Sequence, residues 1–143
     1  AGSHAIVTRP VGAETRISTS PSVHRGKRSR SQTKAPQWIP RAAQEYDGWI
    51  ASAHFTDLAG MSEGMKRFRE AGGTRAIVAN VRVDLGKPTT SLEGERGFHL
   101  QCAPDEARAR LGRLADLGFE HAVLVADDAS EANLAAIRAL RPA

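Results

Sequence analysis

The chain has 143 residues, of which 41% are hydrophobic and 25% charged, as expected for one globular domain with its own core. Its longest apolar runs, Ala76 to Ala79 and Ala122 to Ala126, are far too short to cross a bilayer, so we expect no membrane span. Cys102 is the single cysteine, which excludes an internal disulfide; together with the lack of a signal-peptide pattern, this predicts a cytoplasmic protein.

The charge is unevenly distributed along the chain. Residues 1–41 hold eight Lys or Arg and one acid, a net +7, whereas residues 42–143 hold twelve Lys or Arg and fifteen acids, a net −3. The high pI therefore comes from a basic N-terminal arm. Ala1 to His4 looks like a cloning remnant. We expect residues 1–15 to be that remnant with an extended lead-in, and residues 16–143 to form a single α/β domain.

The first half of the chain predicts two strands and two helices. Arg16 to His24 alternates weakly between apolar and polar residues, as a strand does. A helix follows the basic turn: either Ser31 or Thr33 caps it and it is kinked at Pro40, or it begins near Trp38. It ends at Gly48, where glycine permits a left-handed turn. Trp49 to Ala51 then reads as a short strand covered on both faces. Residues 57–71 carry apolar side chains every three or four positions, which predicts an amphipathic helix.

The second half repeats the alternation of strand and helix. Residues 75–85 follow period two, which predicts one apolar face made by Ile77, Ala79, Val81, Val83 and Leu85. Residues 86–103 show no period and predict a long, mobile loop. A helix from Pro104 to Gly118, a buried strand at 122–126 and a last helix capped by Ser130 follow.

This order of elements predicts a parallel sheet with right-handed crossovers. Four strands, each followed by a helix, amount to half of an eight-stranded barrel, which typically needs about 250 residues. The predicted fold class is therefore α/β, a partial (half) (β/α)8 TIM-type barrel with parallel strands. Because four such units cannot close a barrel, we expect a homodimer or a partner half-barrel.

Ligands in such folds bind where the strands end, which singles out the loops at residues 25–33, 52–56, 86–103 and 127–130. The first loop is basic and leads to a helix N-terminus, an arrangement suited to phosphate, whereas Asp127 and Asp128 in the last loop would repel phosphate. The candidate phosphate-binding residues are Gly26, Lys27, Arg28, Ser29 and Arg30. The alternative is that this basic turn is simply solvated. Nucleic-acid binding is a further alternative, although no aromatic residue interleaves with the charges.

Two histidines lie in loops at the same predicted edge. His54 and His99 are candidate acid–base residues near neutral pH, and the competing explanation for each is an exposed loop histidine. No spacing of ligand residues predicts a metal site.

Three sequence stretches resemble the C-terminal half of the luciferase-like monooxygenases. The stretches are Arg41-Ala42-Ala43 followed after three residues by Asp47-Gly48-Trp49, then Pro104 to Arg108, and then Leu117 to Val125. The resemblance covers roughly residues 20 to 143. It implies a (β/α)8 barrel oxidoreductase that uses FMN or a deazaflavin, and whose cofactor phosphate lies on a Gly-Gly turn. Here that turn reads Gly26-Lys27, so one glycine is missing.

The resemblance also adds Trp49 as a candidate lining of a flavin pocket, with core packing as the favoured alternative. We therefore expect a fragment or shortened member of these enzymes, performing hydride transfer or monooxygenation on a small organic substrate. The family's N-terminal half, which supplies the ring platform and several catalytic groups, is not in this sequence. A non-catalytic α/β module that self-associates or pairs with a partner subunit remains the alternative, with nucleic-acid binding through the basic arm as a third.

Overall fold

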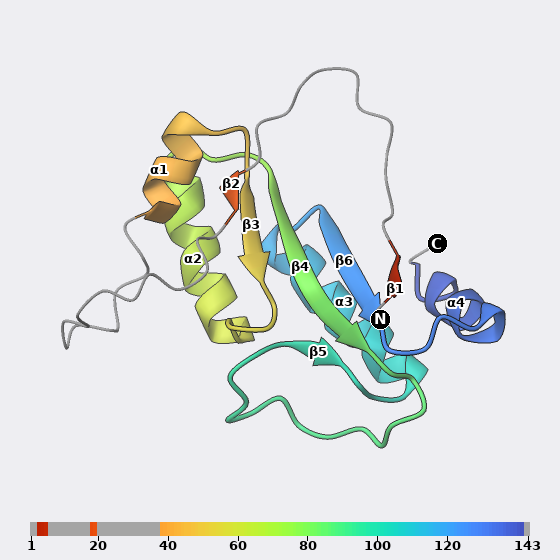
Figure 1. Cartoon of the computed structure of the whole chain (residues 1–143). Coiled ribbons are helices and arrows are strands. Elements are labelled where there is room, and N and C mark those ends of the chain that lie inside the picture. The colour runs from red at the N-terminus through yellow and green to blue at the C-terminus, as the bar shows by residue number, and fades with distance from the viewer. Residues whose placement is uncertain (1–2, 6–17, 20–37, 142–143) are drawn as a thin grey trace, which may run out of the picture.

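The computed structural model of the chain describes residues 3–5, 18–19 and 38–141 (Figure 1). Its strands are β1 (Ser3–Ala5), β2 (Ser18–Thr19), β3 (Trp49–Ser52), β4 (Ala76–Val83), β5 (His99–Leu100) and β6 (His121–Ala126). Its helices are α1 (Trp38–Glu45), α2 (Leu58–Glu70), α3 (Pro104–Leu117) and α4 (Glu131–Arg138). The predicted alternation of helix and strand between residues 38 and 141 is confirmed.

The sheet is mostly parallel, as predicted. Strands β2, β3, β4 and β6 lie side by side in chain order and are parallel to one another. Two strands were not predicted: β5 pairs with the end of β4, and β1 pairs antiparallel with β6. β1 is formed by Ser3–Ala5, residues that we had placed outside the fold. The protein is thus a mixed α/β fold with four described helices.

Local signals set the helix ends. Asp57 caps α2 by accepting a hydrogen bond from the Gly60 backbone N–H at 2.7 Å. Helix α3 begins at Pro104 and ends at Gly118, whose φ of 104° is the left-handed conformation that favours glycine. Each of these helices returns the chain to the start of the next strand, which keeps the strands parallel.

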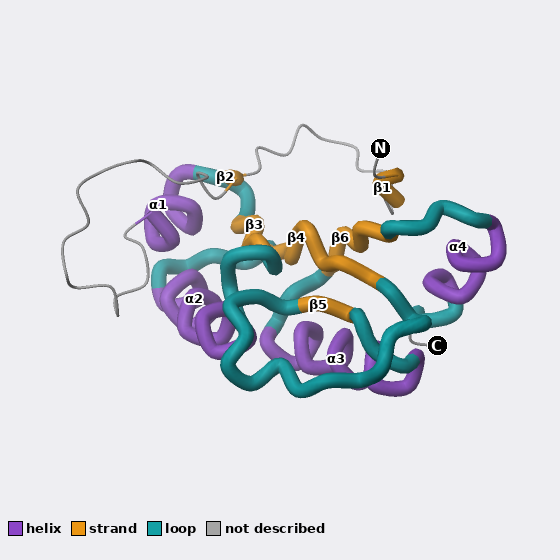
Figure 2. Tube along the Cα trace, turned by 60° about the horizontal axis from the view of Figure 1, so that its bottom comes forward, coloured by secondary structure: helices purple, strands orange, loops and turns teal. Residues whose placement is uncertain are grey.

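The core lies between the sheet and the helices. Figure 2 shows α2 and α3 on the same side of the row formed by β3, β4 and β6. Trp49 is 3% exposed and packs against Phe68 of α2 and Phe119, with ring centroids 5.8 and 5.5 Å apart. Within β3, Trp49 and Ala51 are buried while Ile50 and Ser52 are only half-buried. The expectation that β3 is covered on both faces is therefore wrong for the described part of the chain.

A β-bulge in β4 also changes the predicted pattern. The pairing with β6 shifts between Val78 and Val81, so β4 has one more residue than β6 over this stretch. Asn80, at the bulge, has a φ of 62°. As a result Val81 and Val83 are buried together with Val78, whereas Ile77 is half-buried. The single apolar face predicted from strict period two is therefore wrong, because the bulge reverses the alternation.

Candidate functional site

One face of the sheet lies opposite the core, and we call it the open face. It is mostly apolar toward the N-terminal ends of the strands. Residues paired across parallel strands point to the same side, and Ile50 pairs with Ile77, which in turn pairs with His121. Val123 and Val125 follow on the same face of β6, and both are half-buried. None of these five residues belongs to the buried core on the helix side.

Polar side chains replace the apolar ones toward the C-terminal ends of the strands. Ser52 ends β3, Asn80 and Arg82 lie in the second half of β4, and Asp127 directly follows β6. We call these four residues the polar row. The Asn80 Nδ2 donates a long hydrogen bond of 3.4 Å to the Ser52 Oγ. The Arg82 Nη2 donates to the Asp127 Oδ1 at 2.9 Å, so the row spans three neighbouring parallel strands.

The bulge is what brings Asn80 into this row. Its positive φ is uncommon for a residue other than glycine, although asparagine tolerates it better than most. Among the described residues, Asn80 is the only one besides glycine with such a φ. A bulge shifts the alternation of side chains, and here it places Arg82 on the same face as Ile77, although the two residues are an odd number of positions apart.

The electrostatics of the row are nearly balanced. The hydrogen bond and the charge of Asp127 hold the pKa of Arg82 above its usual value, so the guanidinium stays charged. The pair is half-exposed, with side-chain exposures of 53% and 47%. Next to it, the backbone N–H and hydroxyl of Ser130 lower the pKa of Asp128, which favours its ionised form. The row and its neighbour therefore carry one positive and two negative charges.

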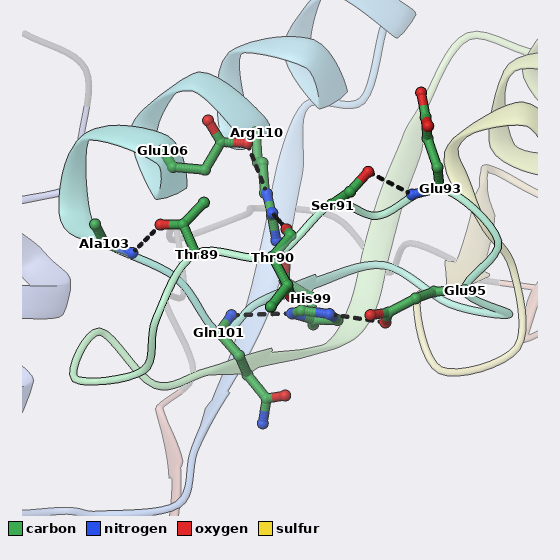
Figure 3. A network of polar contacts seen from close by, with 10 residues as sticks. All are labelled: Thr89, Thr90, Ser91, Glu93, Glu95, His99, Gln101, Ala103, Glu106 and Arg110. Atoms are coloured by element: carbon green, nitrogen blue, oxygen red, sulfur yellow. Dashed lines mark hydrogen bonds and ion pairs between the residues drawn. The ribbon is translucent and has the colours of Figure 1, made fainter.

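His99 is held by both of its ring nitrogens (Figure 3). The Gln101 backbone N–H donates to His99 Nδ1 at 3.1 Å, which leaves Nε2 to donate its proton to Glu95 Oε2 at 2.9 Å. Both ring nitrogens of His99 are thus hydrogen-bonded within the protein. This arrangement ties down the chain around β5.

Arg110 anchors the long segment between β4 and α3. Its side chain is 1% exposed and donates from Nε to Glu106 Oε1 at 3.0 Å (Figure 3). It also donates from Nη1 to the His99 carbonyl at 3.1 Å and from Nη2 to the Thr90 carbonyl. The segment 86–103, expected to be a loop without anchors, therefore contains β5 and is tied to α3.

His54 lies in the turn after β3 and is exposed. Its ring packs edge-on against Phe55, with centroids 4.6 Å apart, and Phe55 is 64% exposed. Neither ring nitrogen of His54 has a hydrogen-bond partner among the described residues. Of the two histidines, His54 alone thus has a ring without a hydrogen bond to the described residues.

The remaining predicted site residues are not brought together. Gly26, Lys27, Arg28, Ser29 and Arg30 lie outside the described residues. Trp49 starts β3 and is buried on the helix side, so it serves the core and does not line the open face. Its indole N–H has no hydrogen-bond partner among the described residues.

Sequence reasoning missed Asn80 and Arg82 because it searched only the loops. The available signal was two polar residues, Asn80 and Arg82, inside the clearest strand of the chain. Among the described residues there is no cluster of three or more potential metal ligands and no helix long and apolar enough to span a membrane. Comparisons with protein-family models, with curated proteins and with solved structures found no match.

Proposed function

We propose that the chain forms one half of a parallel β/α barrel and contributes the carboxyl-edge part of the binding site of a flavin- or deazaflavin-dependent oxidoreductase of the luciferase-like type. The observation that carries the proposal is the polar row, which lies at the C-terminal ends of three neighbouring parallel strands. In parallel α/β folds this edge is where ligands bind.

The arrangement of the sheet supports the half-barrel part of the proposal. The four parallel strands follow chain order, and the helices that connect β3, β4 and β6 lie on one side of them (Figure 2). Successive right-handed crossovers between neighbouring strands produce this arrangement, as in a barrel. The open face then corresponds to the barrel interior, and a partner half-barrel or a second copy of the chain would cover Ile50 and Ile77, at the end away from the polar row.

The described residues fit part of such a cofactor. The polar row offers donors and acceptors for a polar ring edge, and Val123 and Val125 offer apolar surface beside it. They do not fit a phosphate, because the carboxylate of Asp127 offsets the charge of Arg82 and would repel an anion. We therefore assign the phosphate of the cofactor to the basic turn at residues 26–30. When bound, the cofactor would supply the redox chemistry, by hydride transfer or oxygen activation.

The chain's own residues would bind and orient the cofactor and its substrate. Arg82 and Asn80 donate hydrogen bonds at the carboxyl edge, and His54 is the candidate for moving a proton. His99 positions the segment around β5, since both its nitrogens are engaged.

A fluorescence titration of the chain with FMN, and separately with a deazaflavin, tests the proposal. We expect saturable binding that Lys27→Glu or Arg28→Glu weakens about tenfold, because each removes a charge-assisted contact to phosphate. Arg113→Glu, an exposed charge on α3, is the matched control and should leave binding unchanged. Unchanged affinity in both test variants would move the phosphate site elsewhere. Absence of saturable binding by either cofactor would favour a non-catalytic α/β module.

A further inference from the structure

The Arg82–Asp127 pair uses only part of its hydrogen-bonding capacity. One guanidinium nitrogen meets one carboxylate oxygen at 2.9 Å, so the contact is monodentate. The other N–H groups of Arg82 and the second oxygen of Asp127 have no partner among the described residues. A strong donor group and a strong acceptor therefore lie next to each other, half-exposed, on the open face.

Asn80 extends this arrangement toward β3. Its Nδ2 reaches Ser52 at 3.4 Å, which leaves the carbonyl oxygen of Asn80 as an acceptor and the Ser52 hydroxyl as a donor. The bulge fixes the position of Asn80, because its backbone takes a conformation that few residues adopt. Donors and acceptors thus alternate along the polar row.

The charge of the row disfavours anions. Asp127 offsets the charge of Arg82, and Asp128, with its pKa lowered by Ser130, adds a further negative charge. A phosphate or carboxylate would have to displace Asp127 from Arg82 and approach Asp128. An uncharged group that donates to Asp127 and accepts from Arg82 meets neither obstacle.

We propose that the polar row is a subsite for an uncharged ligand carrying two adjacent hydroxyl groups, a vicinal diol attached to an apolar carbon skeleton. One hydroxyl donates to the free oxygen of Asp127 and the other accepts from Arg82. The skeleton lies on the open face beside Val125, which pairs with Arg82, and beside Val123 on the same strand. This assignment deepens the proposed function by naming its substrate class, and it rests on that function in taking the carboxyl edge as the binding edge.

A titration of the isotope-labelled full chain, followed by NMR, tests the subsite without any cofactor. The probes are cis-1,2-cyclohexanediol, cis-1,4-cyclohexanediol and inorganic phosphate, and the signals are the side-chain N–H groups of Arg82 and Asn80. We expect the 1,2-diol alone to shift both signals to saturation. Arg82→Gln, followed through Asn80, should weaken its binding about tenfold, as expected for loss of a hydrogen bond to a charged group.

Arg108→Gln is the matched control. Arg108 pairs with Asp105 at 2.9 Å, and its side chain is about as exposed as that of Arg82. It lies on α3, away from the open face. This variant should bind the 1,2-diol as the wild type does. Asp127→Asn should weaken diol binding about tenfold and let phosphate shift the Arg82 signal, since the repelling charge is gone.

Three outcomes would overturn the subsite. They are equal shifts with the 1,4-diol, shifts with phosphate in the wild type, and no saturable shift with the 1,2-diol. Because cofactor binding is measured separately, a cofactor that binds without a diol effect would overturn only the subsite. A diol effect without cofactor binding would overturn only the proposed oxidoreductase function.

Discussion

Asn80 is the residue that links backbone conformation to the candidate site. At a φ of 62° most residues with a Cβ are strained by roughly 1–2 kcal/mol, whereas asparagine tolerates this conformation better and glycine is not strained. We expect Asn80→Ala to lower the free energy of unfolding by about 1–2 kcal/mol and Asn80→Gly to be clearly more stable than Asn80→Ala. Urea unfolding of the two variants measures the difference. At Arg82, in the same strand, the order should reverse, with Arg82→Ala more stable than Arg82→Gly. Alanine more stable than glycine at position 80 would contradict the bulge.

Arg110 is the residue that holds the segment after β4. Arg110→Met would leave Glu106 and the carbonyls of Thr90 and His99 without their donor in a buried place. We expect a loss of about 3 kcal/mol in urea unfolding, together with faster tryptic cleavage at the exposed Arg96.

The control for Arg110 is an exposed ion pair on the same helix. Arg108→Met breaks the contact with Asp105, which is almost fully exposed, and should cost less than about 1 kcal/mol. Equal losses in the two variants would show that Arg110 does not anchor the segment.

At the scale of elements, close packing of α2 on β3 depends on Gly64. A Cβ at Gly64 would lie 2.6 Å from an atom of the Trp49 ring, whereas one at Gly112 in α3 would meet nothing within 4 Å. We expect Gly64→Ala to destabilise the protein by about 1–3 kcal/mol through overpacking. Gly112→Ala should instead stabilise it by about 0.5–1 kcal/mol, because alanine favours the helix. Thermal unfolding compares the two, and a stabilising Gly64→Ala would contradict the packing of Trp49.

The same elements explain what the sequence could and could not predict. Helix α2 was predictable because Met61, Met65 and Phe68 repeat at helical spacing and all three are buried. Strand β5 has two residues, too few to show a period. The alternation in β4 reverses because β4 has one more residue than β6 between the paired positions. The sequence of β4 alone does not contain this information.

Site residues were predictable only where chain order alone places them. The turn after β3 and the loop after β6 follow from the parallel topology, so His54 and Asp127 were found in the right kind of loop. Asn80 and Arg82 needed the bulge and the pairing register, because strict period two assigned them to the face opposite Ile77. The role of His99 needed its two hydrogen bonds.

At the scale of the whole molecule, the open face predicts association. Covering Ile50 and Ile77 would remove apolar surface from water at about 25 cal/mol per Å². We expect light scattering to show a dimer that dissociates when Ile77→Lys places a charge on this face. Ala109→Lys, on the exposed side of α3, should leave the dimer intact. A wild-type monomer at all concentrations would contradict the need for a covering partner.

The central claim is that the carboxyl edge of the open face binds the cofactor. The most direct measurement is an NMR titration of the labelled chain with FMN and with a deazaflavin, recording side-chain N–H groups and methyl groups together. The account predicts saturable shifts at Asn80, Arg82, Val123 and Val125, with Met61 and Leu114 in the helix-side core unchanged. Shifts confined to the helices, or no saturable shift with either cofactor, would contradict it.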